Sequence, residues 1–432
     1  MYDFCINGGG MVGAALALGL AKQQYRVAII EPHVPKDFVE FSKPDLRVSA
    51  ISDASVSLLR SLGAWEYIEA MRVKPYTGLS VWDDPAHRTD FTAQSIDVPQ
   101  LGFFVENRLL QLGCHQALKA FNNVTWFTGC KVTDIAFANR NGDAVGSDLA
   151  KGFDPAEVPD LAKDFDPAKG SASQQHVATL TLDSGESIHA KWLIGADGAA
   201  SQVRQAANIG VSGWQYGQHA MGITIEMANP VDAITWQQFT PDGPKAFLPM
   251  FDNYASLVWY DSPDELKRLS TLNTVQLKQA IIEAFPSELL KGGNDFTVID
   301  KATFPLTRAH ACRYVSDGVI LVGDAAHTIN PLAGQGVNLG FRDVEVLLGV
   351  IADGIDLTSQ EFKKRLIANY EKPRQRDNGL MMSAMDGFYG LFSNDIGPIK
   401  WIRNQLLSVA QQFEPAKREV LKYAIGMREW KF

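Results

Sequence analysis

Glycines and carboxylates stand together at three places where a predicted strand ends. Gly8–Gly13 has the spacing G-x-G-x-x-G directly after the β-type run Tyr2–Asn7, and the second place is Gly195–Gly198, around Asp197. The third is Gly323-Asp324, after an apolar run. Because open α/β sheets bind ligands at the carboxyl ends of strands, three such ends on one sheet would form one site.

The first of these strand ends has the context of a dinucleotide site. Small and apolar residues from Ala14 to Ala21 suit a helix packed closely on a sheet, and the next strand, Arg26–Ile30, ends at Glu31. In such sites an acidic residue about 20 positions after the glycines binds a ribose hydroxyl, which favours FAD or NAD over NADP. The alternative is a glycine-rich structural turn.

The stretch Val319–Asp343 is organised as strand, turn, loop and helix. Pro331 breaks the chain after Asp324, and Gly334-Gln335-Gly336 leads into a helical pattern that begins with Val337. Bare backbone N–H groups at a helix start stabilise an anion, either a phosphate or a reduced ring that carries negative charge. An ordinary strand–loop–helix unit has the same pattern, but the two other segments fit the same cofactor.

Two arginines stand where an anion could bind. Arg108 lies at the start of a predicted helix, Leu109–Ala120, where a cation is unfavourable for the helix dipole and indicates an anionic partner. Arg47 lies in a polar loop before the strand-like run 48–52. It could bind a phosphate, although its position alone favours a solvated loop arginine.

The composition limits the classes of partner. The 432 residues allow two or three domains, and a formal charge of −9 without a block of Lys or Arg argues against nucleic-acid binding. The four cysteines lack a C-x-x-C pair, which indicates free thiols in a reducing compartment and no metal site. No signal peptide or apolar run of about 18 residues is visible. We therefore expect a cytoplasmic protein without a transmembrane helix, in peripheral contact with the inner membrane at most.

Three regions outside these motifs have distinct patterns. Between Gly198 and Asp317, β-like runs with turn residues at each corner predict an antiparallel second domain, in which Phe239, Phe247 and Pro249 could line an apolar pocket or pack as core. From Asn139 to His176, two similar dozen-residue units predict a surface insertion at the tip of a hairpin, either neutral or docking a partner. A stripe of Met and aromatic residues over 380–392 could pack on the main body or contact a subunit, a lipid or an apolar tail.

The three motifs, in this order, resemble those of the single-component flavin aromatic hydroxylases: G-x-G-x-x-G with Glu31, G-A-D-G-x-x-S-x-x-R at 195–204, and G-D-A-A-H…P…G-Q-G at 323–336. Residues 47–52, 105–107 and 324–338 resemble the UbiH/UbiF/VisC family of ubiquinone-biosynthesis hydroxylases more closely. Within that family, residues 236–244 and 251–263 are most similar to the branch that hydroxylates 3-demethoxyubiquinol. The resemblance covers nearly the whole chain and departs from the family most clearly at 139–176.

The resemblance implies an α/β fold of the aromatic-hydroxylase type. It would have a Rossmann-like FAD-binding domain, an antiparallel β-sheet substrate domain and C-terminal helices. The expected division is an FAD-binding domain at 1–75, 101–210 and 306–350, a substrate domain at 76–100 and 211–305, and a helical region at 351–432.

The resemblance also implies roles for individual residues. The glycines of the first motif would bring the FAD pyrophosphate to the helix, Glu31 would hold the adenosine ribose, and Asp324 would hold the ribityl chain or the pyrophosphate. Pro331 and the residues from Gly334 would lie beside the isoalloxazine ring. The expected FAD contacts are Gly8, Gly10, Met11, Val12, Gly13, Glu31, Arg47, Arg108, Asp197, Gly198, Asp324, Pro331, Gly334, Gln335, Gly336, Val337 and Asn338.

The implied reaction is a monooxygenation. NAD(P)H or an equivalent donor would reduce FAD, O2 would form a flavin C4a-hydroperoxide, and the ring of a polyprenylated quinol would take up one oxygen atom, converting 3-demethoxyubiquinol to 3-demethylubiquinol. No side chain stands out as a catalytic base. The alternatives are hydroxylation at another ring position, a flavin reductase, or a scaffold in a ubiquinone-biosynthesis complex, and a homo-oligomer is compatible with each. The tail length and the donor are not fixed by the sequence.

Overall fold

The structure is a computed structural model that describes residues 1–138, 144–145, 178–293, 295–329, 336–351, 356–392, 418–419 and 421. Three predicted site residues, Pro331, Gly334 and Gln335, lie outside these ranges. Most of the predicted insertion and the chain beyond Phe392, except for three residues, also lie outside them.

Five parallel strands form the centre of the first sheet, in the spatial order β19-β12-β1-β2-β8. Their bounds are β1 Tyr2–Asn7, β2 Val27–Glu31, β8 Val124–Thr128, β12 Ser187–Gly195 and β19 Val319–Leu321. Because β12 lies between β1 and β19, the three predicted strand ends are neighbours at one edge of this sheet. The inference that they converge is therefore confirmed.

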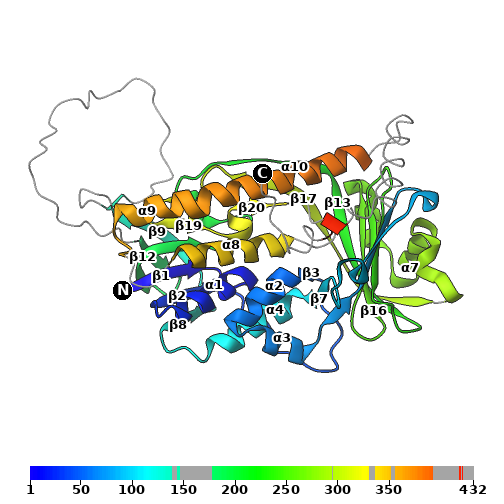
Figure 1. The fold of residues 1–432 in the computed structure, drawn as a ribbon, viewed down its shortest axis with the longest axis horizontal. Helices are drawn as coiled ribbons and strands as arrows, with labels where there is room; N and C mark the ends of the chain where they lie inside the picture. Colours follow the sequence, from blue (N-terminus) through cyan, green and yellow to red (C-terminus); the bar gives the residue numbers. More distant parts are fainter. Residues whose placement is uncertain are drawn as a thin grey trace, which may run out of the picture.

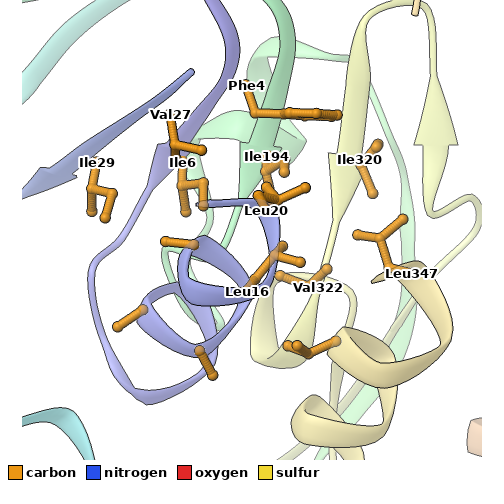
Figure 2. Close-up of a cluster of buried hydrophobic side chains, with 14 of the residues drawn as sticks. Phe4, Ile6, Leu16, Leu20, Val27, Ile29, Ile194, Ile320, Val322 and Leu347 are labelled. Carbon is orange, nitrogen blue, oxygen red and sulfur yellow. The ribbon is translucent and has the colours of Figure 1, made fainter. Parts of the chain in front are cut away.

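Helix α1 (Met11–Lys22) packs between this sheet and helix α8 (Gly336–Val350). Figure 2 shows the core at this place, where leucines of α1 and α8 meet aromatic and β-branched side chains of the strands. The small residues of α1 permit this close packing, because a Cβ at Gly19 would lie 2.1 Å from Leu348 Cδ1. Helices α2 (Asp53–Leu62), α3 (Trp65–Met71) and α4 (Asn107–Leu118) complete this half of the molecule.

Antiparallel strands extend the first sheet beyond β12. β9 (Val132–Ala138) and β11 (Ala178–Leu182) pair with each other, and β11 pairs with the first part of β12. The predicted hairpin is therefore present, and its tip lies largely outside the described residues. The short β10 (Ala144–Val145) pairs with β9, and β18 (Val315–Ser316) pairs with β19.

A second sheet has the order β20-β17-β13-β16-β15-β14-β5-β6. Helices α6 (Pro263–Thr271) and α7 (Thr274–Ala284) pack on one of its faces, and Figure 1 shows α7 on the side farther from the first sheet. The predicted boundary at residue 305 falls inside β17. The strands are β5 Gly78–Trp82, β6 Thr89–Thr92, β13 Val211–Met227, β14 Ile234–Gln238, β15 Lys245–Pro249, β16 Tyr254–Asp261, β17 Phe296–Ala311 and β20 His327–Thr328.

A small third sheet joins the two halves. It has the order β3-β7-β4, with bounds β3 Val48–Ser52, β7 Gly102–Glu106 and β4 Lys74–Tyr76. Ala50, Tyr76 and Phe104 of this sheet share a buried cluster with Leu248 of β15. The face of the second sheet opposite to α6 and α7 is thus turned toward the FAD-binding half predicted from the sequence.

Proline usually ends or kinks a helix, yet the C-terminal helices continue across Pro373. Helix α9 (Gln360–Leu366) runs through a π turn, Ile367–Glu371, into α10 (Lys372–Phe392). Proline cannot donate a backbone hydrogen bond, and the wider π turn just before it accommodates this loss. Within the described part of the chain, no helix combines the length and apolar content needed to span a membrane.

Candidate functional site

The start of α1 is open toward the edge where the three strands end. Its first intrahelical bond runs from Ala14 N to Gly10 O at 2.9 Å, so the N–H groups of Met11, Val12 and Gly13 have no partner within the helix. The first turn holds no acidic residue, and Gly10, the N-cap, has no side chain to cover these donors. Three uncovered donors at the positive end of a twelve-residue helix suit a phosphate.

The three motif glycines have different surroundings. Gly8 has φ +107°, and a Cβ there would lie 2.3 Å from the Ala196 carbonyl oxygen; a Cβ at Gly13 would lie 1.9 Å from the Gly8 carbonyl oxygen. A Cβ at Gly10 would meet nothing within 4 Å. Gly8 and Gly13 therefore permit close packing of the chain on itself, whereas Gly10 borders open space in front of the helix start. The residues present fit a pyrophosphate at this place.

Glu31 ends β2 beside this loop, as predicted. Its side chain is buried, Oε1 accepts a hydrogen bond from His33 N at 2.8 Å, and Oε2 has no partner among the described residues. A carboxylate oxygen left for a ribose hydroxyl agrees with the predicted role.

Two residues of α4 that the sequence did not single out hold the glycine loop. Gln111 Nε2 donates to the Gly9 carbonyl oxygen at 3.1 Å, and His115 Nε2 lies 2.6 Å from the same oxygen. Because a carbonyl only accepts, His115 carries its proton on Nε2. Burial lowers the pKa of His115, which favours this neutral form. These two residues follow the loop by about a hundred residues in the sequence, so no local pattern connects them with it.

Asp197 connects two of the strand ends. Its Oδ2 accepts from Asn7 Nδ2 at 3.1 Å and from the backbone N–H groups of Gln202, at 2.8 Å, and Val203, at 3.2 Å. It thereby ties the end of β1 to the start of α5 (Gln202–Ala206). Gly198 follows with φ +81°, which favours glycine. Asp197 is a positioning residue in this structure, and its predicted place near the flavin stays a prediction.

The second and third motifs contact each other through Arg204. Its Nη1 donates to the Ala325 carbonyl oxygen at 2.8 Å and its Nη2 to the Ala199 carbonyl oxygen at 2.7 Å, while Ser201 caps α5 through its hydroxyl. The motif G-A-D-G-x-x-S-x-x-R thus orders its own turn and fixes the turn of the third motif. Val12 completes the contact among all three motifs, because a Cβ at Gly340 would lie 2.6 Å from its Cγ2 and one at Gly323 3.4 Å from its Cγ1.

Asp324 and Arg47 face the same part of the site. Asp324 is exposed to solvent, yet the surrounding protein removes enough hydration to raise the pKa of its carboxyl, and His327 and Arg47 act in the opposite direction. Arg47 is exposed and close enough to Asp324 for its charge to act on it. Both side chains remain accessible to a ligand, as their predicted roles require.

Arg108 has protein partners. Its Nε donates to Asp45 Oδ2 at 2.6 Å, and its Nη1 donates to the Lys36 and Asp37 carbonyl oxygens at 2.8 and 3.0 Å. It therefore fixes the segment that leads to Arg47. The misplaced cation at a helix start is satisfied by an anionic partner within the chain, and a direct contact of Arg108 with FAD stays a prediction.

The start of α8 is fastened to β3 by Asn338. Its Nδ2 donates to Ala50 O at 2.8 Å, and its Oδ1 accepts from Ser52 N at 3.0 Å and Ser55 Oγ at 2.8 Å. Gly336 begins the helix, and Val337 packs partly buried on the main core. The Asn338 side chain thus positions the helix start, so that a cofactor would meet the backbone of this segment.

A buried ionic network, which no sequence pattern indicated, lies behind the third motif. Asp343 is fully buried; it contacts Arg374 Nε at 2.7 Å and His327 Nε2 at 2.6 Å, and it accepts from Gly323 N at 2.9 Å. Burial alone would raise the pKa of Asp343, but His327 and Arg374 hold it well below its usual range. His327 is therefore a structural residue, and the described residues contain no cluster of three or more side chains that could hold a metal ion.

The three residues suggested for an apolar pocket are placed in the second sheet. Phe247 stacks on Trp236 with centroids 5.4 Å apart and belongs to the core under α6 and α7. Pro249 follows two residues later in β15 and is buried on the same face by strand alternation. Phe239 is buried beyond the end of β14. For Phe247 and Pro249 this placement agrees with the alternative of core packing, while Leu248 is on the face toward the third sheet.

Comparison with known proteins supports the family that the sequence motifs resemble. A family model described as FAD binding domain matches residues 1–379. The chain is 44% identical to 3-demethoxyubiquinol 3-hydroxylase of Escherichia coli (strain K12), with 98% of each chain covered. The chain belongs to the FAD-dependent ubiquinone-biosynthesis hydroxylases.

A further relative agrees with this family membership, and a solved structure agrees with the fold. The mitochondrial ubiquinone biosynthesis monooxygenase COQ6 of Mus musculus is 31% identical, with 98% of this chain and 91% of the relative covered. The crystal structure of p-nitrophenol 4-monooxygenase PnpA from Pseudomonas putida DLL-E4 is similar with a TM-score of 0.73 at 17% identity, covering 100% and 99% of the two chains. This likeness confirms the predicted fold of the FAD-binding monooxygenases.

Proposed function

We propose that this protein is an FAD-dependent monooxygenase that hydroxylates the ring of a polyprenylated quinol, converting 3-demethoxyubiquinol to 3-demethylubiquinol. The overall reaction would consume O2, NAD(P)H and a proton and release water and NAD(P)+, with one oxygen atom entering the ring. The observation that carries the proposal is the 44% identity over 98% of both chains to the Escherichia coli 3-hydroxylase.

The residues of this chain would hold FAD along the edge where β1, β12 and β19 end. The free N–H groups of Met11–Gly13 would bind the pyrophosphate, Glu31 the ribose, and Asp324 with Arg47 the part between pyrophosphate and ring. Bound FAD would supply the two-electron redox chemistry and the activation of O2. The network around Asp343 would keep the Gly323-Asp324 turn in place without touching the substrate.

Complementation in bacteria tests this proposal. The chain is expressed in strains blocked at each ubiquinone hydroxylation step, and the quinones are identified by mass spectrometry. Ubiquinone restored only in the strain that accumulates demethoxyubiquinone supports the proposed ring position. An Asp324→Ala variant that accumulates to the same level but gives no product would exclude a purely scaffolding role, whereas one that restores ubiquinone fully would favour it.

Hydroxylation at another ring position of the same pathway is the second candidate. The 31% identity to COQ6, over 98% of this chain, supports the pathway, because that relative is a ubiquinone biosynthesis monooxygenase whose name specifies no ring position. Rescue of a different blocked strain would show that the substrate is another quinol of the pathway, while the proposed flavin chemistry would stand. As partners we propose a ubiquinone-biosynthesis complex and a second copy of the chain. As location we propose the cytoplasm, with peripheral contact with the inner membrane.

A further inference from the structure

Two buried hydroxyl groups of the second sheet have no hydrogen-bond partner. Thr224 Oγ1 and the Tyr260 hydroxyl are both inaccessible to solvent, and neither is paired within the described part of the chain. Buried polar groups are almost always paired in folded proteins, so each exception requires an explanation.

Both hydroxyls lie on the sheet face that is turned away from α6 and α7. On β13, Met221, Ile223 and Ile225 pack in the core under those helices, so Thr224 belongs to the opposite face. On β16, Trp259 packs in that same core, and Tyr260 therefore points the other way. The opposite face is the one that contacts the third sheet through Leu248.

In the strand register, Gly222 lies between Thr224 and the residue paired with Tyr260. The register of β13 and β16 pairs Ala220 with Tyr260, Gly222 with Val258 and Thr224 with Ser256. A Cβ at Gly222 would lie 3.8 Å from Phe304 Cε1 and 3.9 Å from Leu46 Cγ. A glycine inside a strand weakens the sheet and often marks a place where a ligand approaches the backbone closely. Leu46 directly precedes Arg47, so this place adjoins the proposed cofactor site.

We propose that the ring of the quinol lies over Gly222 and that Thr224 and Tyr260 bind its oxygen substituents. This assignment rests on the proposed function. A hydroxyl group both donates and accepts, so the two side chains can pair with a quinol hydroxyl, a methoxy oxygen or the carbonyl oxygen of the oxidised ring. Leu46, Phe304 and Val258 supply apolar contacts for the ring itself. Thr224 and Tyr260 would thus determine specificity, while the redox chemistry stays with the cofactor.

Thr224→Val and Tyr260→Phe test this assignment, with Thr235→Val as the matched control. Thr235 is a buried threonine on the same face, but its hydroxyl donates to the Phe247 carbonyl oxygen at 2.7 Å. The Thr224 and Tyr260 variants should each raise KM for a short-tailed demethoxyubiquinol, and the Kd for its oxidised form, by about fivefold to tenfold, with FAD affinity unchanged. Their melting temperatures should not fall, because no protein hydrogen bond is lost.

The control should show the reverse behaviour. Thr235→Val should lower the melting temperature and leave KM unchanged, because it removes a bond within the protein. Gly222→Ala adds a methyl group without a close contact in the free protein, and it should raise KM without lowering the melting temperature.

The outcomes separate this assignment from the proposed function. If the wild-type protein hydroxylates the probe and the Thr224, Tyr260 and Gly222 variants keep its KM and Kd, the assignment is wrong while the function stands. A fall in melting temperature like that of Thr235→Val, without a change in KM, would likewise give the hydroxyls a structural role. If the wild-type protein neither binds nor hydroxylates the probe, the proposed function itself fails.

Discussion

Residues of the same type in one motif have separate tasks in this protein. Gly8 and Gly13 are required by the packing of the chain, because a Cβ at either would overlap a carbonyl oxygen. Gly10 is in an ordinary extended conformation, with φ −67°, and borders open space. The fold does not require glycine there, and we infer that it serves a ligand that needs the backbone N–H groups behind it.

Gly10→Ala and Gly13→Ala should therefore differ in what they damage. Gly10→Ala should leave the melting temperature of the FAD-free protein unchanged or slightly raised, but lower FAD affinity at least about tenfold by keeping the pyrophosphate from the helix start. Gly13→Ala should destabilise the FAD-free protein by about 1–3 kcal/mol or more, since its Cβ would lie 1.9 Å from a backbone oxygen. Thermal unfolding and FAD titration measure the two effects, and equal loss of stability in both variants would contradict this division.

Sequence reasoning could locate the candidate site residues whose position depends on local context. The glycines, Glu31 and Asp324 stand at strand ends, and a strand end can be predicted from a short apolar run. The partners of Asp343 could not be found this way. Arg374 follows Asp343 by 31 residues and contacts it only through the tertiary fold. Gln111 and His115 were missed for the same reason.

At the scale of elements, the ends of helices and strands are fixed by polar side chains from other elements. Asn338 joins the start of α8 to β3, and Glu371, in the π turn, accepts from the backbone N–H groups of Tyr314 and Val315 at 2.8 Å each. Tyr370 of the same turn donates to Leu321 O at 2.7 Å. The π turn that the sequence did not predict thus brings adjacent polar residues onto β18 and β19, next to the third motif.

The end of β17 has a histidine that should make stability depend on pH. His310 Nε2 lies 2.8 Å from the Tyr314 hydroxyl, and Asn378 of α10 donates to the same oxygen at 3.1 Å. Burial, followed by the neighbouring His327 and Arg308, lowers the pKa of His310 to about 4 from its ordinary 6.5, and Asp343 opposes this shift.

Between pH 4 and 6.5 the unfolded chain binds a proton at His310 that the folded chain does not, so His310 stabilises the fold fully above pH 6.5 and progressively less as the pH falls. The melting temperature should fall by a few degrees more between pH 7 and pH 5 for the wild type than for His310→Asn. Asp343 does not contribute in this window, because its lowered pKa confines its effect to more acidic pH. Parallel curves for the two proteins would show that His310 is not the titrating group.

At the scale of the molecule, the two large sheets are joined by more than the small third sheet. Arg72 is the centre of this connection. Its Nε contacts Glu106 Oε1 at 2.6 Å, its Nη1 donates to Ser42 O at 2.7 Å, and its guanidinium lies 4.1 Å from the ring centroid of Phe251, between β15 and β16. The segment that carries Leu46 and Arg47 into the site is therefore held by Arg72 as well as by Arg108.

Much of this architecture could be predicted from sequence patterns, but the contacts that join the two large sheets could not. The parallel strands, the antiparallel second domain and the hairpin that flanks the insertion all come from runs of residues that alternate or persist locally. Arg72 lies in an unremarked stretch, and its partners come from three separate parts of the chain. Its importance depends on distances between domains, which no local pattern encodes.

Arg72→Gln should weaken both the fold and cofactor binding. Only 8% of the Arg72 side chain and 2% of the Glu106 side chain are exposed, so the variant leaves a buried carboxylate without its cation, which typically costs about 3–5 kcal/mol. FAD affinity should fall as well, because the segment before Arg47 loses one of its two anchors and keeps only Arg108. Arg268→Gln is the control: its partner Glu265 is on the same exposed helix, and solvent screening leaves such a pair with little effect on stability.

Urea unfolding of the two variants measures how much the buried charge pair stabilises the fold. FAD titration measures whether Arg72 also holds the segment before Arg47. A double variant, Arg72→Met with Glu106→Gln, removes both charges and should recover part of the lost stability. It should not recover FAD affinity, because the methionine cannot donate to the Ser42 carbonyl oxygen as Arg72 does. If Arg72→Gln proved as mild as Arg268→Gln in both measurements, the third sheet alone would hold the two halves together.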